Sequence, residues 1–401
     1  MDSIRNLYKI GHGPSSSHTM APQKAASMFK SENQYATSFR VTLYGSLAAT
    51  GKGHMTDVAI INTLQPYPTE IVWKPDIVLP YHTNGIKFEA IVKDEAVKEW
   101  IVYSIGGGDL SDGKSKTMRE SLYDKHTMKQ ILEWCQQTGK TFWEYVEDTE
   151  GSDIYEYLET VWKTMENAIL KGLETEGLLP GGLGLQRKSS MYYVKSKGYK
   201  GSMKSRALIY AYALAVSEEN ASGNIIVTAP TCGSSGVLPS VLYHLKMNHD
   251  YSDQRIIKAL ATAGLIGNIV KTNASVSGAE VGCQGEVGVA CAMAAAAACQ
   301  LFGGSTQQIE YAAEMGLEHH LGLTCDPVCG LVQVPCIERN AFAAARALDS
   351  CSFAMLSDGK HLINFDKVVR TMQQTGHDLP SLYKETSLGG LAINIGQQDE
   401  Q

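Results

Sequence analysis

The sequence predicts an α+β protein, in which a small N-terminal α/β domain with a mixed or antiparallel sheet precedes a larger all-helical domain. Three observations support this class. Before residue 110, apolar and polar residues alternate in short runs, as they do in strands. From about Lys125 onward, apolar residues recur at helical spacing. The polar run 147–152 separates the two regions, so we expect domains at 1–150 and 151–401.

Composition limits the possible partners and location of the chain. The 401 residues carry a net charge of −7 with no run rich in Lys or Arg, which argues against a nucleic-acid partner. The N-terminus lacks the apolar segment of a secretory signal. The longest apolar run, Val287–Cys299, is too short to span a bilayer. We therefore expect a cytoplasmic protein without a membrane partner.

A cluster of polar side chains comes just before the first predicted helix. Gly13 and Pro14 interrupt the chain, and an Ala-rich segment with helical spacing follows. The polar residues between them are Ser15, Ser16, Ser17, His18 and Thr19. Such residues serve as helix N-caps, but hydroxyls and free N–H groups at a helix start also bind carboxylates or phosphates. The residues alone leave both interpretations open.

The alternating run Phe39–Leu43 predicts the first strand of the sheet. Gly51 and Gly53 then flank a tight turn that ends in His54. This turn can place the imidazole at the mouth of a cleft, and the alternative is an ordinary surface histidine.

Further short strands are predicted before residue 110, at 58–64, 70–73, 76–79, 86–92 and 100–105. The dipeptide Asn84-Gly85, typical of hairpin turns, precedes the fourth of these. Helices are predicted at 128–138, 142–146, 155–176, 203–219, 240–248, 254–270, 286–302, 306–315 and 340–349.

The chain has nine cysteines, an odd number that cannot be fully paired. In a cytosolic protein this favours metal or redox roles for some of them. We expect ordinary buried roles for those in helical surroundings, which are Cys135, Cys291, Cys299 and Cys351.

The remaining cysteines concentrate between Ser277 and Asn340, among glycines and prolines. They include Cys283, Cys325, Cys329 and Cys336. Paired C-x2-C motifs, which indicate zinc, are absent from the sequence, and the irregular spacing resembles the ligand sets of iron–sulfur proteins. Plain buried cysteines remain the alternative.

Three thiolates on a four-iron cluster would leave one iron open. An open iron is a Lewis acid that helps a hydroxyl group leave, as in β-elimination of water from a small hydroxy acid. That reaction also needs a base at the α-carbon and a carboxylate anchor. His54 fits the base, and the Ser15–Thr19 segment fits the anchor.

At these motifs the chain resembles the iron–sulfur-dependent L-serine dehydratases, in their single-chain form with the β domain before the α domain. The matching motifs are G-P-S-S-S-H-T at 13–19, Y-G-S-L-A-A-T-G-K-G-H at 44–54, Y-S-I-G-G-G at 103–108, L-L-P-G-G-L at 178–183, T-A-P-T at 228–231, G-A-E-V-G-C-Q-G-E-V-G-V-A-C at 278–291, and C-D-P-V with V-P-C-I-E-R-N between 325 and 340.

The resemblance implies a role for each candidate residue. Cys283, Cys325 and Cys336 fall on the family's cluster ligands, His54 on its proton-abstracting base, and Ser15–Thr19 on its substrate loop. It implies L-serine as substrate, pyruvate and ammonia as products, and a [4Fe-4S] cluster. It further implies a homodimer and no pyridoxal phosphate.

The chain departs from the family's pattern at two places. Cys232 follows T-A-P-T where an asparagine is common, and the chain ends G-Q-Q-D-E-Q instead of in a cysteine. Two other functions stay open: a cluster-dependent cysteine desulfidase, and a non-enzymatic iron–sulfur sensor with a fourth ligand such as Cys329 or Cys232.

Overall fold

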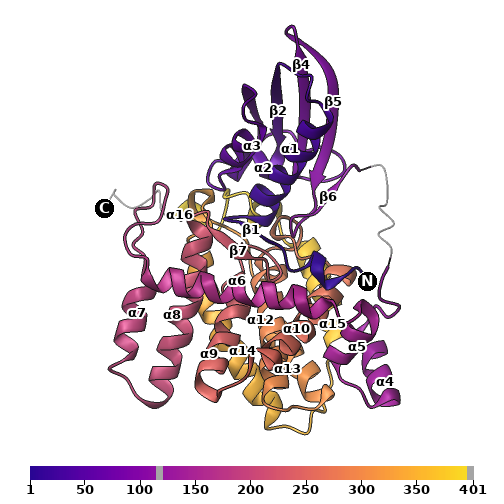
Figure 1. The fold of residues 1–401 in the computed structure, drawn as a ribbon, viewed down its shortest axis with the longest axis vertical. Coiled ribbons are helices and arrows are strands. Elements are labelled where there is room, and N and C mark those ends of the chain that lie inside the picture. Colours follow the sequence, from indigo (N-terminus) through magenta and orange to yellow (C-terminus); the bar gives the residue numbers. More distant parts are fainter. Residues whose placement is uncertain (114–120, 395–401) are drawn as a thin grey trace.

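The N-terminal part of the chain forms a five-stranded mixed sheet. The computed structural model describes residues 1–113 and 121–394, and in Figure 1 this sheet stands at one end of the molecule, above the helices. The strand order is β3-β2-β4-β5-β6; β2 and β3 are parallel and the other neighbours are antiparallel. The strands are β2 (Ser38–Tyr44), β3 (Thr69–Lys74), β4 (Gly85–Val92), β5 (Glu95–Ser104) and β6 (Leu110–Ser111).

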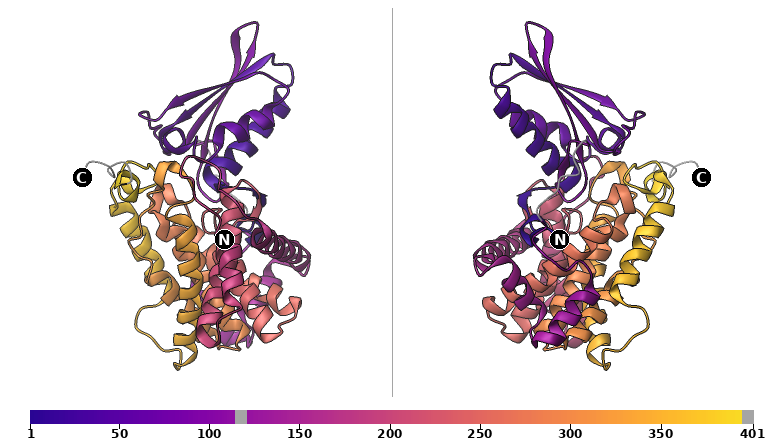
Figure 2. Two further views of the ribbon diagram at one scale, coloured as in Figure 1. Left: turned by 90° about the vertical axis from the view of Figure 1, so that its left-hand side faces the viewer. Right: turned by 90° about the vertical axis from the view of Figure 1, so that its right-hand side faces the viewer.

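Helices cover one face of this sheet, as the side views in Figure 2 show. They are α1 (Ala21–Glu32), α2 (Gly45–Thr50) and α3 (Thr56–Leu64). Phe29 of α1 lies against Phe39, Phe88 and Trp100 of the sheet, with ring centroids 5.4 to 6.2 Å apart. This aromatic cluster is the centre of the small core, because large rings bury the most apolar area.

Two of the predicted strands are wrong. Residues 58–64 lie in helix α3, and residues 76–79 lie in the loop between β3 and β4. In α3 the buried side chains Ile60 and Leu64 are one helical turn apart, whereas Val58 is 43% exposed. The β-branched run favours a strand locally, but packing of one helical face against the sheet decides the conformation.

The larger part of the chain is helical, as predicted. Its helices are α4 (Met128–Thr138), α5 (Phe142–Glu150), α6 (Ile154–Glu174), α7 (Ser189–Ser196), α8 (Gly201–Ala221), α9 (Val237–His249), α10 (Asp253–Asn273), α11 (Gly278–Val281), α12 (Val287–Leu301), α13 (Thr306–Glu318), α14 (Cys336–Met355), α15 (Phe365–Asp378) and α16 (Leu391–Asn394). The α+β class is therefore confirmed. The sequence prediction missed α7, α15 and the short helices α11 and α16.

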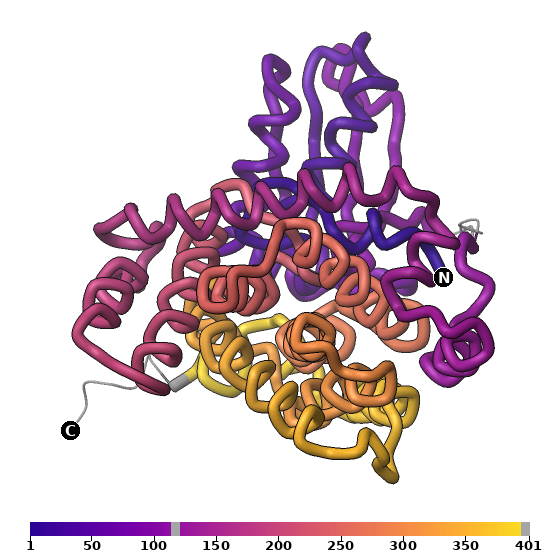
Figure 3. Tube along the Cα trace, turned by 60° about the horizontal axis from the view of Figure 1, so that its bottom comes forward, coloured from indigo at the N-terminus to yellow at the C-terminus, as the bar shows by residue number. Residues whose placement is uncertain are grey.

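Helix α12 is the centre of the helical core. It packs against α9, α10, α13 and α14. Figure 3 shows the helical part from its lower end, with the sheet part beyond it. The run of alanines in α12 keeps the neighbouring backbones close, and Gly316 of α13 lies directly against Ala292. A helix that is apolar on all sides is buried on all sides. Among the described residues, no helix is both long and apolar enough to cross a membrane.

The two parts of the molecule are joined by backbone pairing and by charge. Strand β1 (Ile10–His12) pairs antiparallel with β7 (Ile225–Val227) of the helical part. Asp109, beyond the end of β5, binds the ammonium groups of Lys9 at 2.6 Å and Lys271 at 2.8 Å.

The division into 1–150 and 151–401 stays a prediction. The structure adds that α4 and α5, which precede residue 150, pack in the helical core through Ile131 and Phe142. The terminal residues 396–401, which carry the non-cysteine end, lie outside the described residues.

Candidate active site

The structure brings the predicted substrate loop and the predicted base together at the junction of the two parts. Residues Ser16–Met20 form one π-helical turn that leads into α1, and the side chain of Ser15 caps it by accepting a hydrogen bond from the His18 N–H. All five polar residues of the loop are buried, at 0 to 7% exposure. They are Ser15, Ser16, Ser17, His18 and Thr19.

His18 and His54 lie side by side, with ring centroids 4.5 Å apart. Two crossed hydrogen bonds hold the backbones: Thr19 Oγ1 donates to the His54 carbonyl at 2.8 Å, and Thr56 Oγ1 donates to the His18 carbonyl at 2.6 Å. His54 therefore sits on the substrate loop, although 35 residues separate it from Thr19 in sequence.

The tautomer of His54 follows from its backbone contact. Its Nδ1 lies 2.9 Å from the Thr50 carbonyl at the end of α2. Because a carbonyl only accepts hydrogen bonds, Nδ1 carries the proton and Nε2 keeps its lone pair. Burial, and then the neighbouring His18, lower the pKa of His54 to about 3, so the ring is neutral at physiological pH. A neutral imidazole with a free Nε2 is able to accept a proton.

Glu385 joins the two histidines from the far end of the sequence. Its Oε1 lies 3.4 Å from His18 Nδ1 and 3.8 Å from His54 Nε2. Ser46 Oγ donates to the Glu385 carbonyl at 2.7 Å, and the Glu385 N–H donates to the Cys325 carbonyl at 2.8 Å. Burial raises the pKa of Glu385 to about 7. The sequence analysis missed this residue, because no motif surrounds it.

The three predicted cluster cysteines come from three segments and lie close enough together to act electrostatically on one another. Cys283 lies in the turn between α11 and α12, Cys325 in the loop after α13, and Cys336 is the first residue of α14. Cys283 and Cys325 are buried and Cys336 is half-buried. Burial is the main cause that raises the pKa of each thiol, to about 11 for Cys283, and the neighbouring thiols add to it at Cys325 and Cys336.

Charged side chains surround these thiols. The Arg339 guanidinium hydrogen-bonds to Cys283 and lowers the pKa of that thiol against the effect of burial. Cys325 Sγ lies 3.8 Å from Glu286 Oε2. Burial, together with the Glu385 charge, raises the pKa of Glu286 to about 8. Both Arg339 and Glu286 lie within the matched motifs, so they could have been predicted as site residues from the sequence.

Glycines allow the close approach of these segments. A Cβ atom at Gly53 would lie 2.5 Å from the Gly330 carbonyl oxygen, so the turn before His54 packs directly on the loop after Cys325. A Cβ atom at Gly278 would lie 2.7 Å from Glu286 Oε2 and 3.1 Å from Cys325 Sγ. These positions exclude any larger residue unless the site moves.

The other cysteines differ in their exposure. Cys329 is exposed, with a φ of 54°. Cys232 is buried, with its sulfur 3.7 Å from Met20 Sδ. Those in helical surroundings, Cys135, Cys291, Cys299 and Cys351, are all buried.

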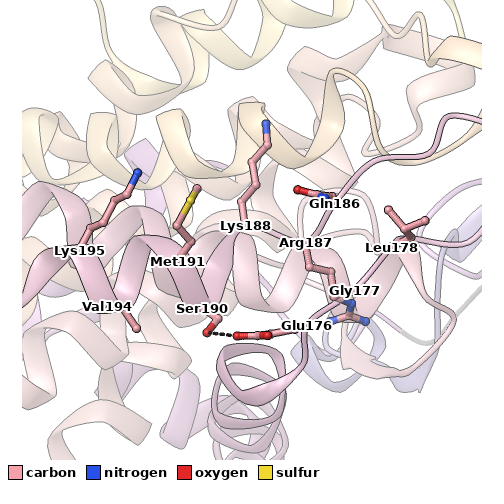
Figure 4. A pocket seen from close by; sticks show the side chains of 10 residues that line it. All are labelled: Glu176, Gly177, Leu178, Gln186, Arg187, Lys188, Ser190, Met191, Val194 and Lys195. Atoms are coloured by element: carbon pink, nitrogen blue, oxygen red, sulfur yellow. Dashed lines mark hydrogen bonds between the residues drawn. The ribbon is translucent and has the colours of Figure 1, made fainter.

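Two surface cavities differ in their relation to this site. A cleft of about 400 Å³ at the junction is lined by His82 and Gly106 of the sheet part and by Glu280 of the helical part. A cavity of about 620 Å³, shown in Figure 4, lies near α7 and is lined by Arg187, Lys188 and their neighbours. It contains none of the predicted site residues.

Comparison with known proteins identifies the family. Residues 83–392 match the family described as "Serine dehydratase alpha chain", and residues 3–67 match "Serine dehydratase beta chain". The chain belongs to the serine dehydratase family. The predicted membership of this family, with the β part before the α part, is thus confirmed.

The chain is similar to serine dehydratases over their whole length. It is 39% identical to "L-serine dehydratase" of Streptomyces coelicolor and 40% identical to "L-serine dehydratase 1" of Escherichia coli; each alignment covers 98% of this chain and 99% of the relative. It is 38% identical to "L-serine dehydratase" of Haemophilus influenzae, again with 98% and 99% coverage. The roles of individual residues in this serine dehydratase family member stay predictions.

Proposed function

We propose that the protein is an L-serine dehydratase, which eliminates water from L-serine to give pyruvate and ammonia. One observation carries the proposal: a buried neutral histidine with a free Nε2 shares one site with the hydroxyl-rich loop Ser15–Thr19 and three grouped thiols. Full-length relatives with the printed name L-serine dehydratase support the same reaction.

Cys283, Cys325 and Cys336 are the residues that would hold the [4Fe-4S] cluster. Among the described residues, no group of three His, Cys, Asp or Glu side chains is placed to hold a single metal ion. A single ion needs all its donors around one centre, whereas in a four-iron cluster each thiolate binds a different iron, so the sulfurs stand further apart. The donor set, three thiols beside a guanidinium, therefore fits a cluster. When bound, the cluster would supply a Lewis acid for the departing hydroxyl group.

The protein's own side chains supply binding and proton transfer. The hydroxyl groups of Ser15 and Ser17 and the N–H groups of the turn hold the serine carboxylate. His54 Nε2 takes the α-proton as the bond between Cβ and the hydroxyl oxygen breaks. Glu385, which lies against both rings, stabilises the imidazolium that forms.

The products follow from this elimination. Loss of the α-proton and the β-hydroxyl group, as water, leaves aminoacrylate, which tautomerises to an imine. Water then hydrolyses the imine to pyruvate and ammonia. The burial of the histidine pair limits competing water at the reacting carbon.

The proposal includes a cytoplasmic homodimer that takes L-serine as its small-molecule substrate and has no nucleic-acid or membrane partner. Its net charge of −7 without a basic run supports the absence of a nucleic-acid partner.

Anaerobic reconstitution tests the function. The protein, supplied with iron and sulfide without air, is assayed for pyruvate with L-serine and, in parallel, with L-cysteine. We expect a brown protein, an EPR signal of one distinct iron site after reduction, and faster turnover of serine. A preference for cysteine would indicate the desulfidase, and a brown protein inactive on both amino acids would indicate a sensor.

A further inference from the structure

The dipeptide Asn84-Gly85 does not form the surface hairpin turn that its sequence suggests. Asn84 immediately precedes β4 and is fully buried. Its backbone is fixed on both sides: the N–H donates to His82 Nδ1 at 3.0 Å, and the carbonyl accepts from the Ser104 N–H at 3.0 Å. Its side chain is different, because neither Nδ2 nor Oδ1 has a hydrogen-bond partner in the part of the chain that the structure describes.

An unpaired carboxamide in a protein interior is unfavourable, because it loses its bonds to water and gains none in return. Asn33, in the same domain, shows the usual solution: it is equally buried, and its Nδ2 donates to the Phe29 carbonyl at 2.8 Å. The two free atoms of Asn84 therefore need an explanation, and a ligand that brings its own partners provides one.

The strand register places the Asn84 side chain on the helix-covered side of the sheet. Side chains alternate along a strand, and Ile86 and Phe88 of β4 are buried in the core beneath the covering helices. Asn84 stands two residues before Ile86 and so faces the same side, beyond the edge of that core. On this side Ser104 Oγ donates to the Ser17 carbonyl of the substrate loop at 2.8 Å.

The residue before Asn84, Thr83, is connected to the histidines through Ser46. Thr83 Oγ1 accepts a hydrogen bond from the Ser46 N–H at 3.2 Å. Ser46 Oγ in turn lies 3.4 Å from His18 Nε2 and donates to the Glu385 carbonyl. Residues next to Asn84 thus contact both the Ser17 loop and Ser46, which lies beside the histidines.

In the helical part, near the end of β5, the hydroxyl group of Ser277 is a second buried polar group of this kind. Ser277 is 2% exposed, and its Oγ lacks a partner among the described residues. A Cβ atom at Gly106 would lie 2.7 Å from the Ser277 Cβ, and Gly106 follows Ser104 by two residues. The junction cleft is lined by His82 and Gly106, which stand two residues from Asn84 and from Ser104 in the sequence.

We propose that Asn84 is a substrate-binding residue that recognises the α-amino-acid group. A carboxamide has an oxygen that accepts and an NH2 group that donates. An amino-acid zwitterion offers the complement, an ammonium that only donates and a carboxylate that only accepts. Oδ1 of Asn84 receives the ammonium hydrogen bond and Nδ2 donates to the carboxylate, which presents the α-carbon to His54. This assignment rests on the proposed function and adds its specificity for amino acids over hydroxy acids.

Binding of non-reacting analogues to the anaerobic, cluster-loaded protein tests the assignment by calorimetry. L-Alanine has both charged groups but no leaving hydroxyl, and propionate lacks the ammonium. Asn84→Ala should weaken L-alanine binding by about 10- to 100-fold, the usual value of hydrogen bonds to charged groups, and propionate binding by clearly less. Asn84→Asp keeps the shape and the acceptor but places a charge beside the carboxylate, so it should weaken both.

The control is Asn33→Ala, which removes an equally buried amide that has its own protein partner. It should lower thermal stability and leave L-alanine affinity unchanged. If both Asn84 variants retain the cluster and bind L-alanine like the wild type, the assignment is wrong and Asn84 is only structural. If the wild type itself neither binds L-alanine nor converts L-serine, the proposed function fails and the assignment fails with it.

Discussion

At the scale of single residues, the position of one proton distinguishes His54 from an ordinary buried histidine. The Thr50 carbonyl fixes the proton on Nδ1, and the remaining nitrogen faces Glu385 and His18. The motif predicted the residue, but only the structure shows which nitrogen is available.

His54→Ala should lower kcat for L-serine by about 10²- to 10⁴-fold, the usual contribution of a positioned base. The cluster absorbance should stay, because no contact of His54 with the three thiols is present among the described residues. Steady-state pyruvate assays and the visible spectrum, recorded on the same anaerobic sample, check both expectations. Normal turnover in the variant would remove His54 from the mechanism.

Single substitution of Cys283, Cys325 or Cys336 by Ser should abolish the brown chromophore and reduce activity to background. Cys329→Ser is the matched control, since Cys329 lies in the same loop as Cys325 but is exposed. Iron content and absorbance of each variant provide the measurement. Loss of iron in the Cys329 variant, with retention in any of the other three, would contradict the ligand assignment.

Burial of His54 also makes the stability of the protein depend on pH, with lower stability at lower pH. Its pKa is about 3 in the folded protein and ordinarily about 6.5 in the unfolded chain. Between these values the unfolded chain binds more protons, so the free energy of unfolding falls as the pH falls through 6.5.

From pH 7.5 to 5.5 the wild type should therefore lose about 1.4 kcal/mol more than the His54→Gln variant, which has no such proton to bind. Urea unfolding of both proteins at the two pH values measures the difference. An equal loss in the two proteins would show that His54 already titrates normally in the fold.

At the scale of elements, short glycine-bearing loops decide whether the site forms. The start of α11 brings Gly278 against Glu286 and Cys325, and the turn after α2 brings Gly53 against Gly330. The C-terminal segment adds a parallel bridge between Lys384 and Cys325, which positions Glu385.

Gly278→Ala should displace Glu286 or Cys325, because its Cβ would meet both inside their van der Waals radii. We expect cluster loading to fall at least several-fold, with far-UV circular dichroism little changed. Gly182→Ala is the control, since nothing lies within 4 Å of a Cβ atom there. Iron-to-protein ratios after identical reconstitution measure the effect, and equal ratios in the two variants would refute it.

At the scale of the whole molecule, the active site exists only where the sheet part and the helical part meet. The loop and histidines come from the first part, and the thiols and Glu385 come from the second. The junction is held by the β1–β7 pairing and by the contacts of Lys9 and Lys271 with Asp109.

Asp109→Asn should weaken this junction. The side chains of Asp109, Lys9 and Lys271 are only 9 to 21% exposed. Removal of the carboxylate charge therefore leaves two largely buried ammonium groups without the negative charge that offsets their loss of hydration. We expect a loss of about 2 kcal/mol in the free energy of unfolding by urea. Glu70→Gln, which breaks the exposed pair with Arg40, should cost under about 1 kcal/mol. Equal effects of the two substitutions would mean that the Asp109 charge does not hold the junction.

The sequence by itself determined the helical part and the motif positions. Long segments such as α10 and α12 carry a helical or uniformly apolar pattern that few other conformations satisfy. Local pattern was insufficient for α3, whose β-branched residues favour a strand until the sheet buries one helical face.

Tertiary structure alone decided three features: the contact of Glu385 with the histidines, the protonated Nδ1 of His54, and the buried amide of Asn84, which has no hydrogen-bond partner among the residues that the structure describes. Each depends on segments far apart in the chain, and Glu385 is more than 300 residues from the rings it contacts. Neighbouring residues determine local conformational preference, whereas burial and hydrogen-bond pairing arise from packing between elements that are distant in the sequence. For this reason the dipeptide Asn84-Gly85 suggests a surface turn in the sequence, although Asn84 is a buried polar residue in the fold.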